Sequence, residues 1–126
     1  MCDKKVNILL IEDCPIAQKV AKMVFTRLNC SIDTANNGMN GIQMAMANQY
    51  DYLIVDVGLP DISGMETIKR LLSETDNYTN QVPIIALTAH NDAEYRDHCT
   101  QHGFTSYYCK PLTLETAKTI LATKVA

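Results

Sequence analysis

The chain has 126 residues, with 11 Lys and Arg, 14 Asp and Glu, and a formal net charge of −3 at pH 7. Because domains cluster at roughly 100–150 residues, this length predicts a single domain over residues 1–126, with its core at about 6–122. The acidic balance disfavours direct nucleic-acid binding, which is typical of a basic surface. Hydrophobic residues make up 47% of the chain, but no apolar run approaches the ~20 residues of a membrane span, so we expect a globular protein without membrane insertion.

The cysteine pattern indicates a reducing compartment. The five cysteines are odd in number, no two have C-x-x-C spacing, and they form no zinc-ligand pattern with the histidines. We therefore expect free thiols and a cytoplasmic location. The first five residues lead directly into a strand-like run, so we expect no signal peptide.

Strand-like and helix-like segments alternate along the whole chain. Apolar runs predict strands over residues 6–11, 30–35, 52–55, 83–87 and 104–108. Helices are predicted over residues 15–28, about 41–48, 63 to about 72, and 91–102, with a last helix capped by Thr113. In the first helix, the apolar residues that recur at helical spacing are Ile16, Val20, Met23, Val24 and Leu28.

Five strand–helix repeats predict an α/β fold. Such repeats form a parallel sheet with helices on both faces, and near-continuous apolar strands are typical of the centre of such a sheet. The second strand, over residues 30–35, is less apolar than the others, which suits an edge position. We therefore predict a flavodoxin-like, doubly wound (βα)5 fold with strand order 2-1-3-4-5.

The candidate site lies at the carboxyl ends of the strands, where open α/β sheets place their ligands. Glu12 and Asp13 follow the first strand, Asp56 follows the third, and Lys110 follows the fifth. Neighbouring central strands bring the three carboxylates together, and two unit charges at 4 Å repel by about 4 kcal/mol at an effective dielectric of 20. One lysine does not offset three carboxylates, so we expect a hard divalent cation, Mg²⁺ or Mn²⁺.

This combination of groups suits phosphoryl transfer. A hard cation and Lys110 would neutralise phosphoryl oxygens, and Thr88 at the end of the fourth strand offers a hydroxyl. Asp56 could then attack as a carboxylate nucleophile and form an aspartyl phosphate.

Several short motifs together resemble the receiver domain of two-component response regulators. The resemblance covers about residues 6–122, and the run from Ile11 to Val20 looks most like receivers of hybrid histidine kinases. The residues that carry the resemblance are Glu12-Asp13, Asp56, Pro60, Gly64, Thr88-Ala89 and Lys110-Pro111.

The resemblance implies a phosphoacceptor and a metal site. Asp56 would be the phosphoacceptor, and Asp13 and Asp56 would bind Mg²⁺ through their carboxylates. Glu12 would hold a metal-bound water, and the backbone carbonyl of Gly58 would be a further ligand.

The resemblance also implies phosphoryl-binding and switch residues. Lys110, followed by Pro111 after a cis peptide bond, would contact the phosphoryl group. Thr88 would be the switch hydroxyl, the Ala89 amide a phosphoryl donor, and Tyr107 the switch aromatic. Their movement would change the surface formed by the fourth helix, fifth strand and fifth helix.

Such a domain is a signalling module, not an enzyme, and its implied partner is a histidine kinase or a histidine phosphotransfer protein. The chain could be a separate regulator or the cytoplasmic part of a membrane-bound sensor kinase. One alternative is an aspartate-nucleophile phosphohydrolase, although Gly58 stands where such enzymes carry an acid. Another is a pseudo-receiver scaffold that is not phosphorylated. A nucleotide or flavin module is disfavoured because the chain lacks a glycine-rich phosphate-binding motif.

Overall fold

The computed structural model describes residues 6–56, 66–67, 69–70, 82–88, 106–110 and 112–122. The strands in these ranges are β1 (Val6–Ile11), β2 (Cys30–Ala35), β3 (Tyr52–Asp56), β4 (Ile84–Thr88) and β5 (Ser106–Cys109). The helices are α1 (Pro15–Arg27), α2 (Gly38–Ala47) and α5 (Leu114–Ala122). Residues 66–67 and 69–70 are helical as well.

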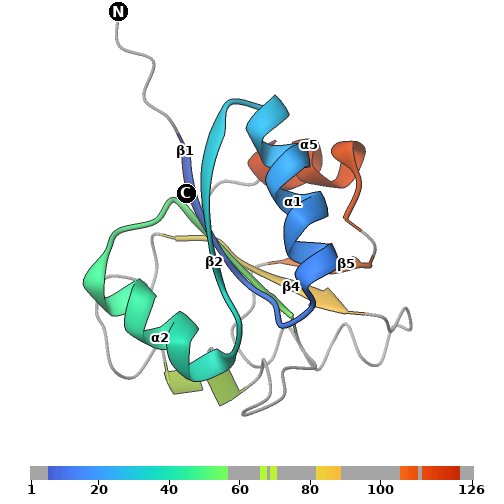
Figure 1. The fold of residues 1–126 in the computed structure, drawn as a ribbon. Coiled ribbons are helices and arrows are strands. Elements are labelled where there is room, and N and C mark those ends of the chain that lie inside the picture. Colours follow the sequence, from blue (N-terminus) through green and yellow to red (C-terminus); the bar gives the residue numbers. More distant parts are fainter. Residues whose placement is uncertain are drawn as a thin grey trace, which may run out of the picture.

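The strands form one five-stranded sheet in the order β2-β1-β3-β4-β5, and all four pairings are parallel. Helices α1 and α5 lie on one face of the sheet and α2 lies on the other (Figure 1). Both the predicted fold class and the predicted strand order are confirmed.

Two apolar cores, one on each face, hold the sheet between its helices. Successive side chains along β1 alternate between the faces, as the pleat of a strand requires. The core under α2 includes Leu9, Ile11, Leu53, Val55, Ile42 and Ala45. The core under α1 and α5 includes Ile8, Leu10, Ile54, Phe25, Ala117 and Ile120. All five residues of β3 and of β4 are buried, which explains their continuous apolar runs.

The helix boundaries follow their capping residues. The structure begins α2 at Gly38, three residues before the predicted start at about 41, because the Asn37 side chain caps it by accepting a hydrogen bond from the Asn40 N–H at 2.8 Å. Thr113 caps α5 as predicted, since its hydroxyl accepts the Thr116 N–H at 3.1 Å.

A glycine lets α2 approach β1 closely. A Cβ atom built at Gly41 would lie 2.3 Å from Cδ1 and 2.6 Å from Cγ1 of Ile11, closer than carbon atoms can pack. The absence of a side chain at this position therefore sets how tightly the helix packs on the sheet.

Some predictions concern residues outside the described ranges. These are the helix over 91–102, the ends of the helix over 63–72, and residues 104 and 105 of the fifth strand. Within the described ranges, no helix has the length and apolar character needed to cross a membrane. The described cysteines, Cys14, Cys30 and Cys109, form no disulfide, in agreement with the prediction.

Candidate functional site

The parallel register of β1 and β3 brings Glu12 beside Asp56. Ile11 pairs with Val55, so the residues that follow them, Glu12 and Asp56, lie side by side. The Glu12 N–H donates to the Ala35 carbonyl at 2.9 Å, which continues the pairing with β2 by one residue. Carboxylate oxygens of Glu12, Asp13 and Asp56 all lie within 4.8 Å of one another. The predicted convergence of these three acids is therefore present in the structure.

Lys110, which follows β5, extends its ammonium group into this cluster. Its backbone N–H donates to the Thr88 carbonyl at 2.8 Å, which fixes the start of the segment after β5 against β4. Its Nζ atom lies 2.8 Å from Oε1 of Glu12 and 3.1 Å from Oδ2 of Asp56. One ammonium thus bridges two carboxylates that are almost completely buried, at 2% and 8% side-chain exposure.

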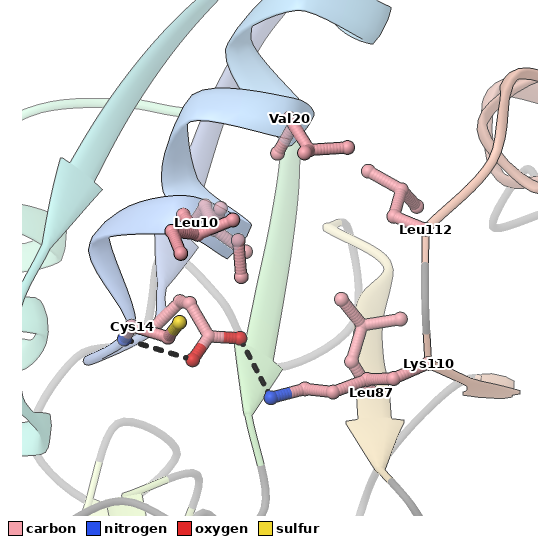
Figure 2. Close-up of a pocket in the computed structure, with 10 residues that line it drawn as sticks. Leu10, Cys14, Val20, Leu87, Lys110 and Leu112 are labelled. Atoms are coloured by element: carbon pink, nitrogen blue, oxygen red, sulfur yellow. Dashed lines mark hydrogen bonds and ion pairs between the residues drawn. The ribbon is translucent and has the colours of Figure 1, made fainter.

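Glu12 is held by both of its carboxylate oxygens. Oε2 accepts the Cys14 N–H at 3.1 Å, while Oε1 accepts from Lys110. Figure 2 shows Cys14 and Lys110 on opposite sides of this carboxylate, each joined to it by a dashed line. The side chain therefore has a fixed direction at the end of β1.

Burial and the Glu12–Lys110 ion pair have opposite effects on the pKa values of these two residues. Desolvation by burial raises the pKa of Glu12, and the neighbouring Asp56 adds to this increase, although Lys110 and the Cys14 N–H oppose it. Desolvation also lowers the pKa of Lys110, but its hydrogen bonds and charge interactions with Glu12 and Asp56 together outweigh that effect and raise it. Lys110 is therefore held firmly in its charged form.

The donor set fits a hard divalent cation. Three carboxylates around one ammonium leave a formal charge of −2 when all are ionised. All the available ligand atoms in the cluster are oxygens, and the exposed side of Asp13 leaves room for the several waters that Mg²⁺ retains. A softer metal would require thiolate or imidazole ligands in this cluster.

Thr88 and Tyr107 lie on the neighbouring strands. Thr88 is 3% exposed at the end of β4, one position beyond the Asp56–Leu87 pair. Tyr107 pairs with Ala86 and packs on the α2 side of the sheet. Because Thr88 is two residues after Ala86, alternation along the strand places it on the same face. The other predicted site residues, Gly58, Ala89 and Pro111, lie outside the described ranges.

Two features beside the acidic cluster were not predicted from the sequence. The first is Gln18 of α1, whose amide bonds the Glu12 carbonyl and Asn36. The second is an apolar cavity of about 230 Å³ next to the Glu12–Lys110 pair, with Leu10, Val20, Leu87 and Leu112 among its lining residues (Figure 2). Neither has a local motif, since each depends on how α1 is placed on the sheet.

Comparison with known proteins shows the class of this chain. The family model of the response regulator receiver domain matches residues 8–122. The chain therefore belongs to the response regulator receiver domain family, whose members are modules of two-component and phosphorelay signalling.

The relatives differ in their overall organisation. Histidine kinase 5 of Arabidopsis thaliana is 33% identical, over 88% of this chain and 15% of its own length. Sensor protein EvgS of Escherichia coli K12 is 30% identical, over 94% of this chain and 10% of its own. Response regulator ArlR of Staphylococcus haemolyticus is 32% identical, over 86% of this chain and 48% of its own. The chain thus spans less than half of each of these relatives.

Solved structures agree with the fold. The receiver domain of the sensor histidine kinase PA1611 from Pseudomonas aeruginosa matches with a TM-score of 0.84 and 30% identity, over 94% of this chain and 95% of that one. That structure has a magnesium ion coordinated in its active-site cleft. The chemotaxis response regulator CheY4 of Vibrio cholerae matches with a TM-score of 0.88 and 23% identity, over 94% and 98% of the two chains, and supports the fold alone.

Proposed function

We propose that this chain accepts a phosphoryl group on Asp56 from a histidine-phosphorylated partner. The observation that carries the proposal is the meeting of Glu12, Asp13 and Asp56 within 4.8 Å, with Lys110 bonded to two of them. An Asp at the end of a central strand, beside a fixed ammonium and a partly open acidic cluster, is placed to act on an anionic donor.

Mg²⁺ or Mn²⁺ would be held by the carboxylates of Asp13 and Asp56, with Glu12 holding a metal-bound water and the Gly58 carbonyl as a further ligand. The cation would supply positive charge that lets an anionic donor approach the acidic cluster. Support comes from the all-oxygen donor set and from the magnesium ion in the related PA1611 receiver domain.

The chain's own residues would carry the transfer. A carboxylate oxygen of Asp56 forms the new bond to phosphorus, the bond from phosphorus to the donor's histidine nitrogen breaks, and that nitrogen keeps the electron pair. Lys110, already 3.1 Å from Asp56, would move its hydrogen bonds to the phosphoryl oxygens. Thr88 and the Ala89 amide would bind the remaining oxygens. In this role the domain assists its own phosphorylation and the later hydrolysis of its aspartyl phosphate. It does not turn over a separate substrate.

Phosphorylation would change the surface near β4 and β5. A bound phosphoryl group favours the conformation in which the Thr88 hydroxyl turns toward it. Tyr107, half-buried on the same face of the sheet, would then occupy the space next to Thr88. The resulting change would extend to the segment over 91–102 and to α5, where a downstream partner would detect it.

The phosphoryl donor would be a histidine kinase or a histidine phosphotransfer protein. One structural neighbour, with a TM-score of 0.83 and 24% identity, is the receiver domain of Ssk1 of Saccharomyces cerevisiae, crystallised with the histidine phosphotransfer protein Ypd1. Several relatives of this chain are hybrid or sensor kinases. We place the chain in the cytoplasm, as a separate regulator or as part of such a kinase, without a direct nucleic-acid partner.

Incubation with acetyl phosphate and Mg²⁺, followed by intact-mass spectrometry, tests the proposal. The parent should gain one phosphoryl group, and Asp56→Asn should gain none. Asp51→Asn, five residues earlier and immediately before β3, is the matched control and should behave like the parent. Equal phosphorylation of the parent and Asp56→Asn would place the acceptor elsewhere and contradict the proposal. Steady turnover of a free phosphate ester would instead indicate a phosphohydrolase.

A further inference from the structure

We propose that Gln18 positions the Asp13 carboxylate for a divalent cation by fixing the peptide group between Glu12 and Asp13. The inference rests on the proposed metal site, and it assigns to α1 a role in setting the affinity of that site. Gln18 itself would not touch the cation. It is a positioning residue, which acts through the backbone of the acidic segment.

The Gln18 side chain makes two hydrogen bonds at once. Its Nε2 group donates one hydrogen to the Glu12 carbonyl and the other to Oδ1 of Asn36, the latter at 2.9 Å. A primary amide nitrogen has two N–H donors, so both are used. Since the amide is planar, two acceptors in different segments fix its orientation far better than one would.

The bonded carbonyl belongs to the peptide group that joins Glu12 to Asp13. The N–H of Glu12 is already held by Ala35, and the Gln18 bond holds the other side of the residue. The next peptide group is held as well, because the Cys14 N–H donates to Oε2 of Glu12. Both peptide groups that flank Asp13 therefore have a fixed orientation.

This matters because the Asp13 side chain is exposed, whereas Glu12 and Asp56 are buried. Surrounding atoms restrict the two buried carboxylates, but packing does little to restrict Asp13. Its direction is set mainly by the backbone that carries it. Without the Gln18 bond, the Glu12–Asp13 peptide could rotate, and the carboxylate would spend less time in the arrangement that a cation needs.

Gln18 also joins two segments that lie apart in the sequence. Asn36 follows β2, and the next residue, Asn37, caps α2. The hydrogen bonds of Gln18 thus link α1, the acidic segment after β1 and the connection from β2 to α2. Asn36 is exposed, so its replacement would remove one anchor of Gln18 at little cost to the core.

Loss of a partner that orients a metal ligand lowers metal affinity by about 10–100-fold. Gln18 acts through a backbone carbonyl instead of the ligand atom, so we expect the lower end of that range. Gln18→Met keeps the length of the side chain and removes its donors. It should weaken Mg²⁺ binding about tenfold, measured by isothermal titration calorimetry, with the same change for Mn²⁺ by electron paramagnetic resonance.

Gln43→Met is the matched control. Gln43 is an exposed glutamine on α2, and its replacement should leave the Mg²⁺ Kd unchanged. Asn36→Ala is the second variant and should weaken binding by a smaller factor. In the Gln18→Met background, Asn36→Ala should have no further effect, because its partner is already absent.

A spectroscopic readout separates positioning from a general loss of structure. In the metal-free protein, Gln18→Met should shift the carbonyl ¹³C resonance of Glu12 and leave the resonances of β4 unchanged. A Mg²⁺ Kd within twofold of the parent, in folded Gln18→Met, would overturn the inference while leaving the proposed metal site intact. If the parent itself binds no Mg²⁺, both this inference and the proposed function fail.

Discussion

Acidic residues have different partners at the two ends of the paired strands β1 and β3. At the amino end, Oδ2 of Asp51 accepts the Asn7 N–H at 2.8 Å, and the Asp51 N–H donates to the Asn7 carbonyl at 2.7 Å. At the carboxyl end, Glu12 and Asp56 lie together and share the ammonium of Lys110. The carboxylate at the amino end therefore accepts a neutral backbone N–H, whereas the two buried carboxylates at the carboxyl end share a cation.

This difference explains why the proposed cation site lies at the carboxyl end of these strands. The neutral Asn7 N–H satisfies the Asp51 carboxylate locally, and the Asp51 N–H donates in return to the Asn7 carbonyl. The carboxyl end gathers more negative charge than Lys110 can offset, which costs folding free energy and favours cation binding. An acidic residue at a strand end is thus structural or functional according to the donors that its neighbours provide.

Removal of the shared ammonium should have the largest effect on stability. In Lys110→Met, Glu12 and Asp56 lose their common partner inside a largely buried cluster. We expect the free energy of unfolding in EDTA at pH 7 to fall by about 3 kcal/mol, the lower end of the cost of breaking a buried ion pair. Denaturant unfolding measures the change.

Lys118→Met, on an exposed position of α5, is the control and should change the free energy of unfolding by less than about 0.5 kcal/mol. Saturating Mg²⁺ should stabilise Lys110→Met more than it stabilises the parent, because more negative charge is uncompensated in the variant. Equal stability of Lys110→Met and the parent in EDTA would show that the ammonium does not hold the cluster together.

The contribution of Lys110 should disappear at high pH. Its pKa is above the ordinary value of 10.5 in the folded chain, so the stabilisation is fully present below pH 10.5 and is lost as the pH rises through the folded-state value. The difference in unfolding free energy between the parent and Lys110→Met should therefore be constant between pH 8 and pH 10 and shrink above pH 10.5. A difference that stays constant to higher pH would exclude this explanation.

A smaller effect is expected at the amino end. Asp51→Ala removes the acceptor of the Asn7 N–H and should lower the free energy of unfolding by about 1–2 kcal/mol. Since no cation is required there, the Mg²⁺ Kd should stay at the parent value. A loss of Mg²⁺ affinity in Asp51→Ala would remove the distinction between the two ends.

The sequence predicted the fold and the acidic cluster because both have short-range signals. The apolar runs define the strands. Glu12 and Asp13 directly follow the first of these runs, and Asp56 directly follows the third. The parallel order then requires Glu12 and Asp56 to be neighbours. Lys110 could be placed at the same edge for the same reason, but its bridging of two carboxylates depends on how the side chains pack in the folded chain.

Other features could not be predicted because they depend on how one element lies on another. Helical spacing of Ile16 and Met23 correctly predicted α1, but these side chains are 74% and 63% exposed, and Ala21 and Phe25 face the core instead. Apolar spacing gives the helix without giving its rotation about its axis. The same rotation brings Gln18 over the Glu12 carbonyl, which explains why the sequence gave no indication of that contact.

Calorimetric titration with Mg²⁺, comparing the parent with Asp13→Asn, tests whether the acidic cluster at the carboxyl ends of β1 and β3 binds a divalent cation. Asp13 is exposed, so its replacement by a neutral side chain of the same shape should not disturb folding. We expect one Mg²⁺ per chain for the parent and a large loss of Mg²⁺ affinity for Asp13→Asn. Equal Mg²⁺ binding by the two proteins, or none by the parent, would contradict it.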